Sequence, residues 1–335
     1  MTPDAGSQLL GTLADGRLHS GAAIASRLGV SRTAIWKLVA ELRASGVPVE
    51  SVARRGYRLP RAVELLDASR IRDAAGAQGA RLPAGLEVLF EVDSTNDYLY
   101  RAAPPESGAP RVVFAELQHA GRGRRGRTWV APFGSGLTFS VAWTFDEVPA
   151  GLSALGLAVG VGVAQALRDA GVAETMLKWP NDIVWRHRKL GGLLLQLRSE
   201  SGGPASVVVG LGLNLVLAQD ARRSLAASGA PLAVDLEEAL DGRPCERNAL
   251  AARLACGVLR VLGDFGREGY APFAGRWQAL DSLAGARVCV IQGEGSVEGQ
   301  ALGADRDGAL CVAVRGRTER FYSGDVSLRP APPDA

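Results

Sequence analysis

The sequence is poor in the residues that form disulfides and bind metals. It contains 335 residues, with four cysteines and three histidines. The cysteines form no CxxC pair, so we expect neither a disulfide scaffold nor a zinc site, and free cysteines fit a reducing cytosol. The N-terminus also lacks the basic and then apolar order of a secretory signal peptide. These absences predict a cytoplasmic protein without zinc.

A strong excess of charge of one sign is also missing. The net charge is +3, and hydrophobic and charged residues make up 47% and 22% of the chain. Such a composition is ordinary for a globular protein and does not mark a bulk nucleic-acid binder. Any site for a polyanion must therefore come from local clusters of arginine and lysine.

A long apolar run without interruption is absent as well. The segment Val148–Leu167 carries no charge, but it contains Pro149, four glycines and Gln165. Its apolar residues are mostly alanine, valine and leucine. This composition predicts a buried core helix rather than a membrane span.

Residues 1–62 predict a winged helix-turn-helix domain. A short helix over Ser20–Leu28 has Ala23, Ile24 and Leu28 on its inward side and is followed by a turn at Gly29. Ser31 is placed to cap a second helix that ends near Gly46. The apolar residues of that helix follow the spacing i, i+3, i+4, i+7 and are Ile35, Leu38, Val39 and Leu42. Two extended pieces, Val47–Val52 and Tyr57–Leu59, then enclose a basic hairpin tip, Arg54-Arg55-Gly56.

Two further domains are expected, which makes the fold class α+β and multidomain. Residues 65–280 alternate apolar strands with helices, typical of a central α/β domain with a mixed sheet. The expected helices are Asn96–Ala102, Leu152–Ala170 and Arg247–Glu268. The expected strands are Leu86–Val92, Val112–Gln118, Leu137–Trp143, Thr175–Lys178, Asp182–Trp185, Leu190–Leu197 and Ser206–Leu213. Residues 283–331 contain short β segments and predict a small SH3-like β-barrel.

Four segments of the central domain carry candidate chemistry. The run Gly121–Trp129 combines three glycines with four arginines, which can bind phosphates or carboxylates, although it is not a Walker A loop. The run Lys178-Trp179-Pro180-Asn181-Asp182 aims polar side chains outward and is followed by Lys189 beside a glycine pair. Asp93–Asp97 follows a strand and can cap a helix, and Gly210–Asn214 is a strand interrupted by glycines. Alone, the first run is equally typical of a solvated arginine-rich loop or an RNA-binding patch. Lys189 alone is more typical of an exposed lysine on a hairpin.

Together these segments resemble the bifunctional biotin–protein ligases, also called biotin operon repressors. The resemblance covers nearly the whole chain and rests mainly on GRGRRGRTW and KWPND, with weaker support from Ser94-Thr95-Asn96, Gln118, GLGLN, Arg276-Trp277 and Gly324–Leu328. It implies an ATP-dependent ligase that converts biotin to biotinyl-5′-AMP. It then transfers biotin to a lysine of the biotin carboxyl carrier protein of acetyl-CoA carboxylase.

The resemblance also implies roles for individual residues. The expected catalytic residues are Lys189, Arg122 and Arg124. The expected biotin contacts are Ser94, Thr95, Asn96, Gln118, Arg122, Gly123, Arg124 and Lys189. The expected ATP and adenylate contacts are Arg122, Gly123, Arg124, Trp129, Asn181, Asp182 and Asn214. Mg²⁺ is expected to accompany ATP; Asp182 is a candidate to orient either this ion or the incoming lysine, and the sequence does not separate the two.

The same resemblance implies repression of biotin genes by a homodimer that forms when biotinyl-AMP is bound. The expected contacts to operator DNA are Ser31, Arg32, Thr33, Lys37, Arg54 and Arg55. Trp36, on the same helix, is either a core residue or a DNA contact. Two other functions remain open: a lipoate–protein ligase, and a repressor that senses biotinyl-AMP without catalysis.

Overall fold

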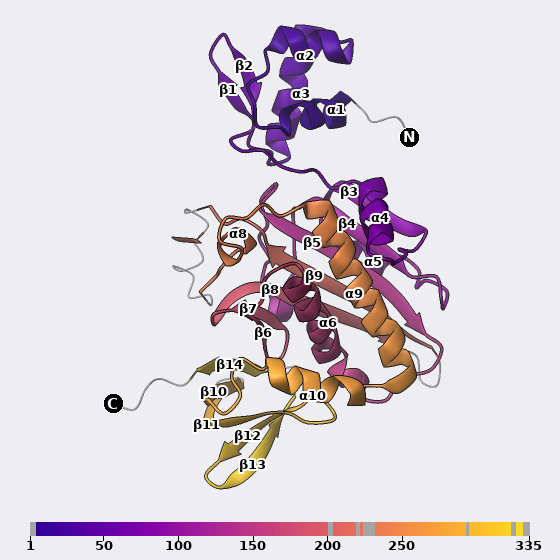
Figure 1. Cartoon of the computed structure of the whole chain (residues 1–335), viewed down its shortest axis with the longest axis vertical. Coiled ribbons are helices and arrows are strands. Elements are labelled where there is room, and N and C mark those ends of the chain that lie inside the picture. The colour runs from indigo at the N-terminus through magenta and orange to yellow at the C-terminus, as the bar shows by residue number, and fades with distance from the viewer. Residues whose placement is uncertain are drawn as a thin grey trace.

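The computed structural model describes residues 5–199, 204–218, 222–223, 232–292, 295–322 and 326–330. Three groups of elements follow one another along its longest axis (Figure 1), with the N-terminal helices at one end and a small β-sheet at the other. A mixed sheet covered by helices lies between them. The predicted fold class is confirmed, and we retain 1–62, 65–280 and 283–331 as proposed domain limits.

The N-terminal group is a helix-turn-helix followed by a two-stranded wing. Its elements are α1 (Ala5–Leu13), α2 (Gly21–Leu28), α3 (Arg32–Ala44), β1 (Glu50–Val52) and β2 (Gly56–Arg58). Ser20 and Ser31 cap α2 and α3 by accepting hydrogen bonds from the backbone of Ala23 and Ala34. The expected inward position of Ala23 is wrong: it lies in the first turn of α2 and is exposed, whereas Ile24 and Ala25 enter the core.

The central group is built on a seven-stranded sheet with the order β3-β4-β5-β9-β8-β7-β6. Only the β3–β4 pair is parallel among its described pairs. The strands are β3 (Gly85–Val92), β4 (Arg111–Gln118), β5 (Gly136–Phe145), β6 (Thr175–Lys178), β7 (Asp182–Trp185), β8 (Arg188–Ser199) and β9 (Ala205–Asn214). Each predicted strand is therefore present, with its ends shifted by at most two residues.

Helices cover both faces of this sheet. The main core lies under α4 (Ala68–Ala77), α6 (Leu155–Asp169) and α9 (Arg247–Glu268), while α5 (Thr95–Arg101) packs on the other face. The single helix expected over Leu152–Ala170 is interrupted. A 3₁₀ turn, η2 (Leu152–Ala154), precedes α6 because Gly151 has a left-handed backbone and Ala154 departs from helical geometry. In the part of the chain that is described, no helix is long and apolar enough to cross a membrane.

The C-terminal group is an antiparallel sheet with the order β13-β12-β11-β10-β14. Its strands are β10 (Arg287–Gln292), β11 (Gly295–Ala304), β12 (Leu310–Val314), β13 (Arg317–Phe321) and β14 (Val326–Pro330). The sequence did not predict β14 as a strand, and Gly324 and Asp325 lie outside the described residues. Two unpredicted helices, α8 (Leu236–Ala239) and α10 (Ala271–Leu280), complete the central part. Figure 1 shows α10 between the two sheets, where it joins them.

Candidate functional site

The floor of the candidate site is a buried polar cluster at the start of α5. Ser94 caps this helix, and Ser94, Thr95 and Asn96 are all buried. The backbone and hydroxyl of Thr95 both donate to Oε1 of Gln118, at 2.8 and 3.2 Å. The predicted group of Ser94, Thr95, Asn96 and Gln118 is therefore brought together from two elements, α5 and β4.

Asn96 and the glycines of β9 fit closely against one another. The side-chain amide of Asn96 donates to the carbonyl oxygen of Leu194 and to Oε1 of Gln196, at 3.2 and 3.0 Å. A Cβ atom on Gly210 would lie 2.1 Å from Oδ1 of Asn96, and one on Gly212 would lie 2.4 Å from the Trp129 ring. Because only glycine allows these approaches, the glycine alternation of this strand makes room for the floor and for the indole.

The arginine-rich loop is closed on itself above this floor. The backbone of Gly123 donates to Arg127 at 2.7 Å, and that of Trp129 donates to Gly121 at 2.8 Å. Between them a short 3₁₀ turn spans Arg124–Gly126. An open cavity of about 290 Å³ lies under the loop. Its lining residues are Arg122, Gly123, Arg124, Arg125, Gly126, Leu194 and Gln196.

Arg122 and Arg124 of the loop contact polar groups from other elements. Arg122 forms an ion pair of 2.6 Å with Asp97 on α5. Arg124 donates to Oδ1 of Asn181 at 3.2 Å, and burial lowers the pKa of this guanidinium. A partly buried guanidinium beside an open cavity favours an anionic ligand. The charge of such a ligand offsets the cost of removing the guanidinium from water.

Lys189 adds a third cation to Arg122 and Arg124, and these three residues are called the charged wall below. Its ammonium donates to Oδ1 of Asp182 at 2.6 Å and lies 6.0 Å from the centre of the Trp129 ring. Asn181 donates to the carbonyl of Leu193 at 2.6 Å, which fixes the end of the KWPND run against β8. The predicted residues Asn181, Asp182 and Lys189 thus lie on adjoining segments beside the arginine loop.

Asn214 has a different position from the other predicted nucleotide contacts. Its amide donates to the carbonyl oxygens of Val234 and Lys189, at 3.0 and 3.4 Å. The backbone of Lys189 is also paired with the segment that contains Leu232 and Val234. Asn214 therefore supports the strand that carries Lys189.

Sequence reasoning missed three polar residues of the site. Ser140 on β5 lies within hydrogen-bond distance of Thr95 Oγ1 and Asn96 Oδ1, at 2.8 and 2.7 Å. Gln196 on β8 contacts Asn96, and Asp97 pairs with Arg122. Ser140 and Gln196 lie inside strands with no distinctive local pattern, so only the sheet register identifies them. Asp97 stood within the Asp93–Asp97 segment but was read as part of a cap.

The candidate nucleic-acid interface is the outer face of α3 with the wing. Arg32, Thr33 and Lys37 are exposed there, and Arg54 and Arg55 lie at the wing tip with Arg54 in a left-handed conformation. Ser31 is exposed but already caps α3.

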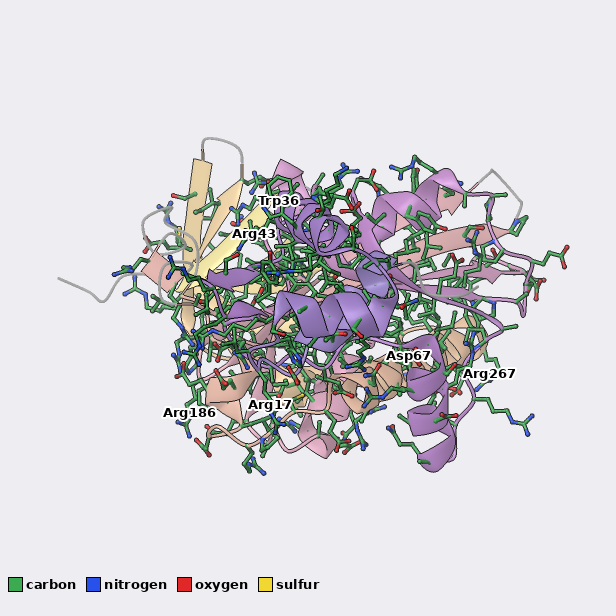
Figure 2. All side chains as sticks on the ribbon, turned by 90° about the horizontal axis from the view of Figure 1, so that it is seen from above. Arg17, Trp36, Arg43, Asp67, Arg186 and Arg267 are labelled. Atoms are coloured by element: carbon green, nitrogen blue, oxygen red, sulfur yellow. The ribbon has the colours of Figure 1, made fainter. Side chains whose placement is uncertain are left out.

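Trp36 lies on the same outer face of α3. Its side chain is 63% exposed, so the interpretation of Trp36 as a core residue is wrong. Figure 2 looks down on this end of the molecule and shows Trp36 on the outside of the domain.

The comparisons with known proteins cover all three groups of elements. Three family models match the chain: an HTH domain over residues 7–58, the biotin/lipoate A/B protein ligase family over 89–214, and the biotin protein ligase C-terminal domain over 284–329. The bifunctional ligase/repressor BirA of Salmonella typhimurium is 38% identical over 325 residues, which is 96% of this chain and 97% of that protein. The Escherichia coli protein of the same name is 37% identical over 326 residues, or 97% of each chain.

A solved structure agrees with these relatives. The biotin protein ligase of Aquifex aeolicus in complex with biotin and ATP has a TM-score of 0.61 and 26% identity, covering 74% of this chain and all of that one.

Proposed function

The chain belongs to the bifunctional ligase/repressor family, and on that premise we propose how its central site activates biotin with ATP and transfers it to protein. One observation carries the assignment of the site. Lys189 on β8 and two arginines of the Gly121–Trp129 loop, Arg122 and Arg124, lie beside a polar floor that includes Ser94 and Gln118. Cations beside a polar floor are what a reaction between a carboxylate and a polyphosphate requires.

The first step joins two anions. A carboxylate oxygen of biotin attacks the α-phosphorus of ATP, and the bond from that phosphorus to the bridging oxygen breaks to release pyrophosphate. A carboxylate is ionised at neutral pH, so no base is needed. Lys189 and Arg124 would act by stabilising the negative charge that develops between the two reactants. Arg122 would approach the biotin side, where Asp97 already orients it.

The polar floor suits a ureido ring. Such a ring presents two N–H donors and one carbonyl acceptor, and Ser94, Thr95, Asn96 and Gln118 supply hydroxyl and amide groups that can satisfy both kinds. Trp129 and Asn181 would contact the adenine side, the first by packing and the second by hydrogen bonding. The Trp129 indole N–H is buried without a partner in the structure, which supports a ligand acceptor near it.

Asp182 fits a magnesium ion delivered with ATP. Mg²⁺ is commonly held by one or two carboxylates together with substrate phosphates, and the Asp182 carboxylate lies beside the charged wall. The ion would neutralise phosphate charge. The other candidate role of Asp182 is to orient the lysine of the carrier protein in the second step, in which the amine attacks the acyl carbon and AMP leaves.

The names of the relatives support a protein acceptor, and the helix-turn-helix domain supports a DNA partner. We infer that the acceptor is the biotin carboxyl carrier protein of acetyl-CoA carboxylase. A biotin operator would contact α3 through Arg32, Thr33, Trp36 and Lys37, and the wing through Arg54 and Arg55. Helix side chains would read base edges and the wing arginines would contact phosphates. An exposed indole among cations suits an apolar contact to a thymine methyl group.

The assignment is tested by biotin-dependent exchange of labelled pyrophosphate into ATP. Purified protein is expected to catalyse exchange with biotin and not with lipoate, and to add biotin to a purified carrier domain, which mass spectrometry detects. Exchange with lipoate alone would identify a lipoate ligase. Operator binding without any exchange would identify a sensor that lacks catalysis.

A further inference from the structure

The KWPND run is held from behind by the C-terminal sheet. The indole of Trp179 is 1% exposed, and its Nε1 donates to the carbonyl oxygen of Gly308 at 3.1 Å across 129 residues of sequence. A buried indole N–H needs an acceptor, because leaving it unpaired costs free energy. The run that carries Asn181 and Asp182 therefore depends on a turn of another domain for this hydrogen bond.

That turn, residues 305–308, is itself rigidly built. Asp305 accepts hydrogen bonds from the backbone of Asp307 and Ala309, at 2.9 and 3.0 Å. Arg320 on β13 bridges both carboxylates, with 2.6 Å to Asp305 and 2.7 Å to Asp307. The position of the Gly308 carbonyl is thus set by contacts within the C-terminal sheet.

The turn is also seated on the start of the central helix. Ser153 donates to the carbonyl of Asp307 at 2.7 Å. Gly308 has a φ of +79°, and a Cβ atom there would lie 2.8 Å from Cα of Ala154. A residue with a side chain at this position would clash with Ala154 and would displace the turn that carries the Gly308 carbonyl.

We propose that this turn is a positioning element for adenylation, in which Arg320 and Gly308 act through Trp179 to place Asn181 and Asp182 against Arg124 and Lys189. The inference rests on the proposed function of the central site. It gives the C-terminal sheet an indirect part in the first chemical step, because the described contacts of Arg320 lie within that sheet. Misplacing a catalytic contact by about 1 Å can cost about 100-fold in rate, so a small loss of anchoring has a large effect.

The test compares three variants in pyrophosphate exchange. Trp179→Phe removes the N–H and keeps a smaller aromatic ring, and Arg320→Ala releases the two carboxylates. Arg306→Ala is the matched control on the same turn because its side chain is 93% exposed. The first two are expected to lower kcat by about 10- to 100-fold while the KM for biotin is unchanged, because the biotin floor lies on α5 and β4. Arg320→Lys, which keeps one charged contact, should recover part of the loss, and Arg306→Ala should match the wild type.

Each alternative outcome is decisive. Wild-type kcat in both Trp179→Phe and Arg320→Ala would overturn the inference. Parallel loss of biotin binding and exchange would also overturn it, since that result indicates general unfolding rather than positioning. Absence of exchange in the wild type would instead refute the proposed function.

Discussion

At the scale of single residues, the charged groups of the site are placed by their neighbours. Lys189 and Asp182 are both largely buried and face one another at 2.6 Å, with side-chain exposures of 27% and 17%. A partly buried pair of this kind is screened less by water than a surface pair. Removing Lys189 or Asp182 therefore removes one group from the site and also leaves the charge of the other without its partner.

Lys189→Met is expected to lower adenylate formation with little change in the affinity for biotin alone. Loss of one preorganised charge contact in a transition state costs about 2.7–4 kcal/mol, or about 100- to 1,000-fold in rate. Pyrophosphate exchange measures this directly. Arg186→Ala is the control because Arg186 lies on the same hairpin and is exposed. Among its described ion pairs, Arg186 pairs only with Glu174. Figure 2 shows Arg186 at the edge of the molecule. Normal exchange in Lys189→Met would refute the role of Lys189.

The buried carboxyl of Asp281 is expected to make the free energy of unfolding depend on pH. It is buried with one oxygen unpartnered, and burial raises the pKa of its carboxyl above the ordinary range of an aspartic acid. Between the ordinary pKa and the raised pKa, the Asp281 carboxyl ionises in the unfolded chain and stays protonated in the folded one. The contribution of Asp281 to stability therefore falls as the pH rises through this window. Asp281→Asn should therefore gain stability relative to the wild type over that window. Urea unfolding at several pH values checks this, with exposed Asp73→Asn as control, and a difference independent of pH would contradict it.

At the scale of elements, the linker between the winged helix and the central sheet, residues 59–67, is held by several hydrogen bonds. The backbone of Leu66 donates to Glu116 at 2.5 Å, and Arg247 at the start of α9 pairs with Glu116 at 2.8 Å and donates to the carbonyl of Glu64 at 2.6 Å. Asn248 donates to Glu64 and Leu65, at 2.8 and 2.9 Å. The linker is thus anchored by the N-terminal turn of a helix about 180 residues away in sequence.

Arg247→Met is expected to destabilise the protein strongly. Arg247 and Glu116 have side-chain exposures of 6% and 4%, and breaking a buried pair leaves an uncompensated charge. The expected loss is about 3–5 kcal/mol in free energy of unfolding. Chemical denaturation measures it, and Arg267→Met on the exposed face of the same helix should change little. Replacing Glu116 with Gln as well should restore part of the loss, because the buried charge is then removed.

At the scale of the whole molecule, the winged helix has its own core. Residues of α1, α2 and α3 form a cluster separate from the main one, and Leu117 and Phe133 of the central part join its edge. The backbone of Val63 donates to Ala14 at 2.8 Å, which ties the linker to α1. The two parts are therefore distinct cores in contact through the linker.

Deleting residues 1–62 should abolish operator binding and leave part of the ligase activity. The biotin floor, the arginine loop and Lys189 all lie outside the deleted segment. Operator footprinting and pyrophosphate exchange on the same preparation measure the two functions. Footprinting of full-length protein at low salt, with biotin and ATP present, is the positive control. Retained operator binding by the truncated protein would refute the interface on α3 and the wing.

Biotinyl-AMP is expected to strengthen homodimerisation more than ATP alone. A ligand that fills the cavity under the arginine loop would order that loop. The coupling free energy between binding of such a ligand and dimerisation is typically about 1–3 kcal/mol. Sedimentation equilibrium with and without biotinyl-AMP measures the dimer constant. Arg124→Ala should weaken the coupling because it removes the contact to Asn181. Identical dimer constants under both conditions would exclude the mechanism.

Local sequence determined the strands, the caps and the identity of the reactive segments. Apolar segments that alternate with helices predicted the strands of the central sheet, and Ser31 indicated the start of α3, because these signals depend on neighbours along the chain. The glycine and arginine pattern of Gly121–Trp129 likewise indicated an anion site. Helices α1, α4, α8 and α10 were missed, since much of the stability of a short helix comes from packing.

Tertiary structure decided which side chains meet. Ser140 beside Thr95, Gln196 beside Asn96, and Gly308 behind Trp179 are contacts between segments far apart in sequence. The exposure of Trp36 was likewise decided by packing, because the apolar face of α3 was already complete without it. Such contacts follow from sheet register and domain docking, which depend on the whole chain and leave no local pattern in any single segment.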